Sequence, residues 1–402
     1  VIPQLGLIGQ TISYPDSSVL AHGNWYKITV PNTGLYKLTY SDFVALGVPE
    51  AEIKSANLSV YGNGGKQISL VTAEYKNSDL LENSIYISDA SGSFKNGGFA
   101  VFYAQGNNEF FYNPIDNKYS FRIHPYSYTT TYFITFDENI GLKKRVNSVT
   151  MPMSYDTVTP YFRDCFLSKQ EVNSPNASGR NWLGKQFTNN SKIEDYPLDM
   201  SNSYTDENNQ YINPAIFEMN VVAQSEKESY FISNFNNQFL DSTKLTPVFE
   251  MSYTDIANSK YIRRNILSVN PVSNKISIKY SGNSIAKGWI DYMLVSFDRS
   301  LKYNYPAILS FKNTESLIQN KVVSHLISNV KNSDIIVWDV TNHIEPKQII
   351  GEYNSVDFTY RINLGSDSLL NLVAFNNNSS FNTVNHVGKI ENQNLHATPA
   401  ID

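Results

Sequence analysis

The chain has 402 residues, of which 41% are hydrophobic, 13% aromatic and 17% charged, and its formal net charge is −5. This length exceeds one ordinary core and predicts two or three domains, and the apolar content excludes wholesale disorder. Basic residues are scattered, so nucleic-acid binding is not expected. Abundant Tyr, Phe, Thr and Val, with few stretches rich in Ala, Leu and Glu, predict a mostly β, multi-domain protein with few short helices.

The longest apolar runs of the sequence lie at 292–297 and 334–340. Both are far shorter than the roughly 20 residues that cross a bilayer, so they are interpreted as core strands and no transmembrane segment is expected. The one cysteine, Cys165, excludes an intrachain disulfide. Low charge together with many Asn, Ser, Thr and Tyr residues is typical of exported β proteins.

Residues 1–149 are predicted to form an N-terminal β-rich domain. Its first two strands are expected at 24–30 and 35–40, and the Pro, Asn and Gly between them predict a β-hairpin. Alternating or apolar runs predict further strands at 57–61, 84–88, 98–103 and 128–136. The domain is therefore expected to be built from short strands.

Two local signals refine this domain. Ser41 and Asp42 are predicted to cap a short helix over 43–46, which Gly47 ends. The segment Gly62–Gly65 predicts a turn rather than a phosphate loop, because no Ser or Thr follows Lys66.

The segments on either side of the middle region have weaker patterns. Residues 150–210 carry little periodicity and are interpreted as a connecting segment with local order around Cys165 and Trp182. Residues 312–402 are expected to hold further β strands and then, over 388–402, a polar linker.

Residues 211–311 have the clearest β pattern and are predicted to form a β-sandwich, jelly-roll-like domain. One face of its first strand is apolar at every second position, with Glu218 and Asn220 opposite: Ala215, Phe217, Met219, Val221 and Ala223. The run 289–297 is apolar on nearly both faces, which is typical of a central strand.

No self-sufficient catalytic site is expected. Cys165 lies among aromatic residues and beside Asp164, which would raise the pKa of the thiol, so a structural cysteine is favoured over a nucleophile. No two histidines have the i,i+2 or i,i+4 spacing of a local zinc pair, although a site built from distant positions stays open. The histidines are His22, His124, His325, His343, His386 and His396.

The other chemical candidates are also read as structural. Residues 89–98 resemble an acidic cation loop, but only Asp89 supplies a carboxylate, so a polar turn is favoured. Ser178–Arg180 followed by Trp182 could bind an anion, although an Arg stacked on a Trp is commonly structural. No obvious glycosidase pair stands out among Asp291, Asp298, Asp339 and Glu345, and Asp298 is expected to pair with Arg299 or to cap a turn. No catalytic, cofactor-binding or metal-binding residue is therefore assigned.

Six separated segments resemble, in order, the PorU family of gingipain-like cysteine peptidase-sortases of the type IX secretion system. They are Asn24–Phe43, Val60–Gly65, Phe102–Gly106, Ser178–Gly184, Gly288–Tyr292 and Val337–Thr341. Gly388–His396 is similar to the segment that precedes the family's peptidase domain. The chain departs from the family ahead of Phe102, where Gly97 and Gly98 stand in place of a more acidic loop.

This resemblance implies a non-catalytic N-terminal scaffold and docking region at the outer surface of a Gram-negative bacterium. The family's catalytic His and Cys lie in a domain that the resemblance places after Asp402. The implied parent is a cell-surface cysteine peptidase that removes sorting signals from type IX cargo and attaches the cargo to lipopolysaccharide. The implied partners are outer-membrane secretion components and cargo proteins. No cofactor is expected. The alternative is a carbohydrate-binding β-sandwich module that takes lipopolysaccharide or another glycan.

Overall fold

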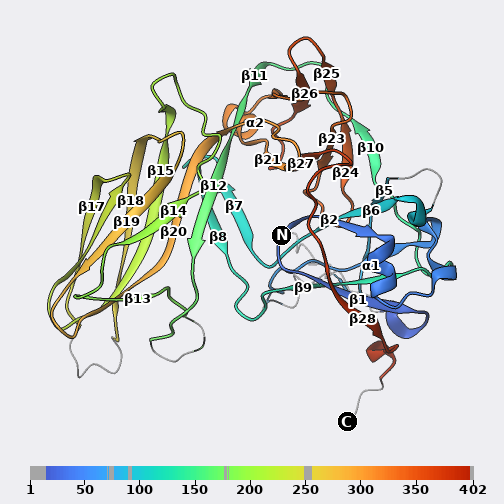
Figure 1. Ribbon diagram of the computed structural model, residues 1–402, viewed down its shortest axis with the longest axis horizontal. Helices are drawn as coiled ribbons and strands as arrows, with labels where there is room; N and C mark the ends of the chain where they lie inside the picture. Colours follow the sequence, from blue (N-terminus) through green and yellow to red (C-terminus); the bar gives the residue numbers. More distant parts are fainter. Residues whose placement is uncertain are drawn as a thin grey trace, which may run out of the picture.

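The computed structural model of the protein describes residues 15–69, 71, 77–88, 93–175, 179, 181–248 and 256–398. In this part the chain is mostly β and holds two α-helices of six residues each. It packs as an N-terminal unit and two β-sandwiches (Figure 1). The predicted mostly β, multi-domain fold is therefore confirmed.

The N-terminal unit contains two sheets around one core. The five-stranded sheet has the order β28 (Asn385–Ile390), β1 (Trp25–Val30), β9 (Thr130–Thr135), β3 (Ser59–Tyr61) and β4 (Glu82–Asn83). The three-stranded sheet has the order β2 (Gly34–Thr39), β6 (Phe99–Ala104) and β5 (Ile85–Ile87). Short 3₁₀ helices lie at η1 (Val19–Ala21), η2 (Glu50–Glu52), η3 (Ser55–Asn57), η5 (Phe94–Asn96) and η6 (Leu395–Ala397).

The predicted hairpin at the start of this unit is wrong. β1 pairs with β28 and β9, whereas β2 pairs with β6, so the two strands belong to different sheets. The connection is an arch: the Tyr36 hydroxyl donates to the Asn32 carbonyl across 2.8 Å, and the Gly106 N–H donates to the Thr33 hydroxyl across 2.9 Å. The same turn residues reverse the chain in an arch and in a hairpin, so they do not decide which strands pair.

The predicted short helix is present as α1 (Tyr40–Ala45). Its capping residue is Thr39 rather than Ser41, and Asp42 accepts from the Thr39 backbone N–H across 2.7 Å, which completes a capping box. Gly47 has a φ of 86°, the left-handed conformation that ends many helices.

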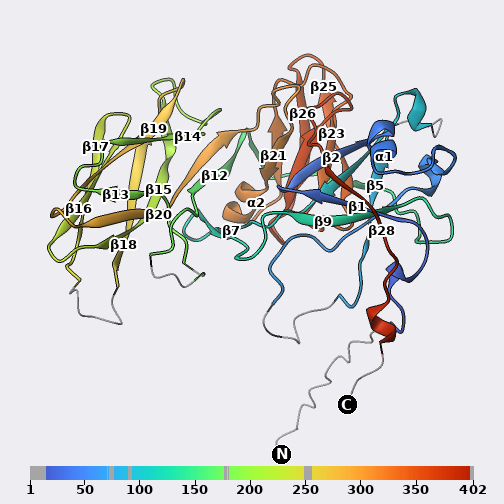
Figure 2. The same ribbon diagram turned by 60° about the horizontal axis from the view of Figure 1, so that its bottom comes forward.

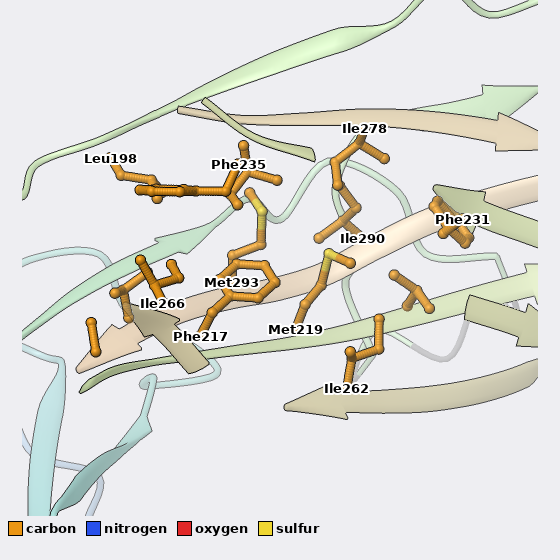
Figure 3. Close-up of a cluster of buried hydrophobic side chains, with 14 of the residues drawn as sticks. Leu198, Phe217, Met219, Phe231, Phe235, Ile262, Ile266, Ile278, Ile290 and Met293 are labelled. Atoms are coloured by element: carbon orange, nitrogen blue, oxygen red, sulfur yellow. The ribbon is translucent and has the colours of Figure 1, made fainter. Parts of the chain in front are cut away.

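The middle sandwich holds the largest cluster of buried side chains. Its first sheet, named here the β20 sheet, has the order β12 (Tyr161–Lys169), β20 (Lys287–Ser300), β15 (Gln210–Gln224) and β18 (Asn258–Ser268), with β13 (Gln186–Thr188) also on β20. Its second sheet has the order β14 (Glu194–Leu198), β19 (Asn274–Ser281), β16 (Ser229–Phe235) and β17 (Gln238–Leu245). Figure 3 shows the aromatic, aliphatic and methionine side chains that fill the space between them. The alternating residues predicted for β15 all lie in this core.

The segment 150–210, expected to be a connection, instead contributes strands to both sandwiches. β12 pairs with β20 along nine residues, from Tyr161 opposite Ser300 to Lys169 opposite Tyr292. β13 and β14 follow it into the two sheets of the middle sandwich. Polar residues interrupt β12, which is why its sequence lacks a simple alternation.

The third unit is a second sandwich. One sheet has the order β10 (Asn147–Thr150), β24 (Lys347–Ile350), β23 (Ile336–Asp339), β27 (Asn371–Phe375) and β21 (Leu309–Lys312). The other has the order β11 (Thr157–Thr159), β22 (Val323–Ile327), β26 (Thr359–Leu364) and β25 (Glu352–Asn354), and α2 (Thr314–Gln319) lies between β21 and β22 in the chain.

The N-terminal unit and the third unit are adjacent, and the middle sandwich lies at the far end of the molecule (Figure 2). Leu35 and Val101 of the three-stranded sheet pack on Trp338 and Phe375 of the third unit. The end of the chain also returns to the N-terminal unit. Residues 388–390, predicted to start a linker, are the last residues of β28, which pairs with β1.

Candidate functional site

A hairpin of the N-terminal half crosses the outer face of the β20 sheet. It consists of β7 (Glu109–Asn113) and β8 (Lys118–Arg122) and lies between the N-terminal unit and the middle sandwich (Figure 1). The Tyr119 backbone N–H donates to the Ser296 hydroxyl across 3.1 Å, and its own hydroxyl donates to the Arg163 carbonyl across 2.7 Å. The hairpin covers only part of the face.

The uncovered part is a cleft of about 580 Å³. Its floor is the outer face of the β20 sheet, and its sides include described residues of β8 and the segment after it, and residues 171, 175 and 181–183. The lining residues described by the structure are Phe121, Ile123, Pro125, Lys169, Glu171, Pro175, Asn181, Trp182, Leu183, Asn220, Val222, Ile256, Ala257, Ser259 and Asp291. This is the candidate functional site.

A β-bulge in β20 shapes the floor of the cleft. Asn220 of β15 lies opposite Tyr292, but the next residue of β15 lies opposite Ile290, so Asp291 has no partner there. Ile290 and Met293 both belong to the core, and the two residues between them are therefore turned to the outer face. Bulges commonly re-aim side chains in this way next to functional sites.

The carboxylate of Asp291 is held from two sides. Lys169 Nζ lies 2.8 Å from Asp291 Oδ1, and Asn220 Nδ2 donates to Asp291 Oδ2 across 3.0 Å. Lys169 Nζ also donates to the Trp182 carbonyl across 2.9 Å. From the described residues, each carboxylate oxygen thus accepts one hydrogen bond, which leaves a lone pair for another donor.

Two aromatic side chains line the cleft. Trp182 is 38% exposed, and its indole N–H donates to the Gly179 carbonyl across 3.1 Å. The ring of Phe121 meets the ring of Tyr292 edge-to-face at a centroid distance of 4.9 Å. The two bulge residues therefore connect to both aromatic side chains: Tyr292 packs on Phe121, and Asp291 pairs with the lysine that binds the Trp182 carbonyl.

Cys165 lies on β12 opposite Ser296, away from the cleft lining. Burial raises the pKa of its thiol, and the neighbouring Asp164 raises this pKa further, while Lys312 and Arg299 oppose the shift. The sequence expectation for the effect of Asp164 is confirmed, although burial is the larger cause. A thiol with a raised pKa is a poor nucleophile at neutral pH.

The histidines lie in separate environments. His325 is buried in the third unit, where desolvation lowers its pKa to about 4, and its Nδ1 donates to the Val323 carbonyl across 3.1 Å. Burial also lowers the pKa of His343, and His386 Nε2 lies 3.0 Å from Asp42. Among the described residues, no group of three or more His, Cys, Asp or Glu side chains could hold a metal ion.

The predicted carboxylate candidates do not meet in one place. Asp298 pairs with Arg163 at 3.0 Å, so the expected pairing with Arg299 is wrong. Arg299 instead pairs with Asp164 at 2.6 Å. The other two carboxylates have partners elsewhere: Asp339 accepts from the Thr341 N–H, and Glu345 pairs with Lys144 of a distant segment. Of this set, the cleft contains Asp291.

The glycine segment 62–65 lies in the loop after β3 and lines a second hollow of about 610 Å³. Gly64 has a φ of 81°, and a Cβ on Gly65 would lie 2.0 Å from the Thr130 hydroxyl. Close packing explains these glycines. Asp89, Ser178 and Arg180 lie outside the described residues, so the polar turn and the structural arginine favoured there stay predictions.

Sequence reasoning did not find the cleft. Lys169, Asn220 and Phe121 carried no signal of their own, because they come from three distant segments. The available signal was the pair of segments Ser178–Gly184 and Gly288–Tyr292, which the structure brings together: the Gly184 N–H donates to the Ile290 carbonyl across 2.9 Å.

No helix in the described part of the chain is long and apolar enough to cross a membrane.

No family model matches the sequence, and no curated protein matches it. Among solved structures, the chain is similar to dimeric latent PorU from Porphyromonas gingivalis, with a TM-score of 0.79 at 19% identity. The match covers 96% of this chain and 35% of that chain, so this chain spans about a third of its length.

Two further matches have low TM-scores. The insecticidal delta-endotoxin Cry8Ea1 from Bacillus thuringiensis has a TM-score of 0.22 at 10% identity, covering 60% of this chain and 42% of that chain. A structure of infectious bursal disease virus, Gx strain, has a TM-score of 0.20 at 7% identity, covering 91% and 85%. Neither supports an argument. The comparisons therefore show that this chain has a PorU-like fold.

Proposed function

We propose that the chain is the non-catalytic N-terminal scaffold and docking region of a PorU-like cysteine peptidase-sortase at the outer surface of a Gram-negative bacterium. The full-length parent would process type IX cargo and attach it to the cell surface. The observation that carries the proposal is the likeness to latent PorU over 96% of this chain but 35% of that chain. The partners in this role are outer-membrane secretion components and cargo proteins.

The physical character of the chain supports a docking role. Its units bury aromatic cores, and two of its more buried ion pairs, Lys118–Glu218 and Arg163–Asp298, join different strands. Docking surfaces need shape and anchored aromatic side chains rather than shifted pKa values. The thiol of Cys165, whose pKa is raised, fits a structural residue.

The test uses the bacterium that produces the chain. Cells from which its coding sequence is deleted should accumulate type IX cargo that keeps its C-terminal sorting signal, measured by mass spectrometry of surface fractions. Re-expression of the wild-type sequence should restore processing. Normal processing in the deletion strain would contradict the proposal.

A matched variant separates scaffolding from catalysis. Cys165→Ser should restore cargo processing as fully as the wild type, because the thiol has no chemical role in this proposal. If it fails at wild-type protein levels, or if the purified chain hydrolyses peptides at a rate that Cys165→Ala abolishes, the chain is not a non-catalytic scaffold.

A second candidate function is a carbohydrate-binding module. The observation that favours it is the cleft of the middle sandwich, with the part-exposed ring of Trp182 on one wall and polar side chains on its floor. β-Sandwich and jelly-roll domains often bind saccharides on such faces.

A further inference from the structure

We propose that the cleft on the outer face of the β20 sheet is a saccharide-binding site, in which a pyranose ring stacks on Trp182 and its hydroxyl groups bind Asp291 and Asn220. This proposal rests on the second candidate function, a carbohydrate-binding module, and does not depend on the scaffold role. The cleft volume of about 580 Å³ falls within the range of roughly 300–1,000 Å³ found for small-molecule sites.

The floor of the cleft is ordered before any ligand arrives. Lys169 and Asn220 hold one carboxylate oxygen of Asp291 each, at 2.8 Å and 3.0 Å. A ligand hydroxyl can donate to the remaining lone pairs without a rearrangement of these side chains. Hydrogen bonds from a hydroxyl to an ionised carboxylate are among the stronger ones.

The charges of the described lining residues favour a neutral ligand. Lys169 and Asp291 balance one another in a single ion pair, and Glu171 adds a negative charge at the wall. The described lining residues therefore offer no excess of positive charge to a phosphate or another polyanion. A hydroxyl-rich ring needs hydrogen bonds and an apolar surface instead.

Trp182 provides that surface. Its indole N–H is bound to the Gly179 carbonyl, and its own carbonyl is bound to Lys169 Nζ, so the backbone and the ring are both fixed. A fixed aromatic ring that is 38% exposed offers a large contact area with little loss of side-chain entropy on binding. Phe121 adds a second aromatic side chain to the lining of the cleft.

An extended peptide fits this floor less well. Asn220 and Asp291 lie on β15 and β20, and both strands already have neighbours on each side in the sheet. Their backbone groups cannot add another strand, so a peptide would lose the main-chain hydrogen bonds that usually provide its affinity.

The experiment applies the purified chain to an array of neutral polysaccharides, comprising β-glucans, mannans and lipid-free O-polysaccharides, with unstructured peptides on the same slide. The strongest saccharide is then titrated by calorimetry. We expect saturable saccharide binding; O-polysaccharide as the best probe would identify lipopolysaccharide as the source, and a glucan or mannan would identify a free glycan. No saccharide binding at millimolar concentration, or binding of peptides alone, overturns the proposal.

Variants locate the binding. Trp182→Ala should weaken it about tenfold or more, Asn220→Ala roughly three- to tenfold, and Trp182→Phe should keep part of it. The matched control is Phe239→Ala, which removes an exposed aromatic side chain from β17 of the opposite sheet and should change affinity by less than about twofold. Equal thermal midpoints exclude unfolding as the cause. Retention of wild-type affinity by Trp182→Ala would contradict the site, while leaving the scaffold role untouched.

Discussion

The outer face of the β20 sheet has a half covered by the β7–β8 hairpin and an open half, and each half contains an ion pair with a different degree of burial. Beneath the β7–β8 hairpin, Arg163 and Asp298 form an ion pair at 3.0 Å, and each side chain is 1% exposed. In the open cleft, Lys169 and Asp291 form an ion pair at 2.8 Å, with side chains 12% and 25% exposed. The two ion pairs have similar N–O distances, but water reaches the Lys169–Asp291 pair and is excluded from the Arg163–Asp298 pair.

This difference shows what the hairpin contributes. The buried guanidinium also donates from Nε to the Asn117 carbonyl and from Nη2 to the Pro214 carbonyl, and Asn213 donates to Asp298. Such saturation offsets the cost of removing both charges from water. The open pair keeps lone pairs and solvent access, so its half of the face is available to a ligand and the covered half is not.

The largest effect is expected from breaking the covered pair. Arg163→Met leaves the Asp298 carboxylate buried with Asn213 as its remaining side-chain partner, and should lower the free energy of unfolding by about 3–5 kcal/mol, measured by urea titration. The double variant Arg163→Met/Asp298→Leu removes the unpaired charge and should recover at least half of this loss. A single-variant loss below about 1 kcal/mol would mean that the two halves do not differ.

His325 tests how much burial alone costs an ionisable side chain, because no described residue forms an ion pair with it. Burial lowers its pKa from 6.5 to about 4, so between these values the unfolded chain binds a proton that the folded chain does not. The contribution of the neutral His325 to the free energy of unfolding is therefore fully present above pH ~6.5. The free energy of unfolding falls by roughly 3 kcal/mol as the pH drops to ~4. Urea titrations across this range should show a steeper loss for the wild type than for His325→Leu. Equal slopes would show that His325 does not titrate in this window.

The sequence predicted the elements whose pattern is local. The alternation of Ala215, Phe217 and Met219 revealed the buried face of β15, because one face of a strand repeats every second residue. Asp42 and Gly47 likewise predicted α1, since a cap and a left-handed glycine act within one turn.

The rest depends on contacts between distant segments. The turn before Gly34 could not show that β1 and β2 enter different sheets. The bulge at Asp291 was hidden because the run 289–297 is apolar on both faces, so the change in alternation left no visible break. The cleft joins Phe121, Trp182 and Asp291 from separate regions of the chain, which no local spacing records.

A smaller effect is expected at the edge of the covered half, where Lys118 pairs with the buried Glu218 at 2.8 Å. Lys118→Met leaves Glu218 with the Tyr261 hydroxyl and should cost about 1–2 kcal/mol, less than Arg163→Met because Lys118 is partly exposed. Lys118→Arg keeps the charge and should cost less than half as much in the same urea titration. If Lys118→Met costs nothing, the hairpin does not dock through this pair.

The smallest effect is expected in the cleft itself. Asp291→Asn removes the charge from a pair that water already reaches, and should lower the free energy of unfolding by less than about 1 kcal/mol. Asp298→Asn makes the same chemical change in the covered half and is the matched control, with an expected loss several times larger because Arg163 would then be buried without a counter-charge. Equal losses for these two variants would remove the energetic distinction between the halves. Unequal losses would show that burial beneath the hairpin, and not the distance between the charges, determines how much each ion pair contributes to the free energy of unfolding.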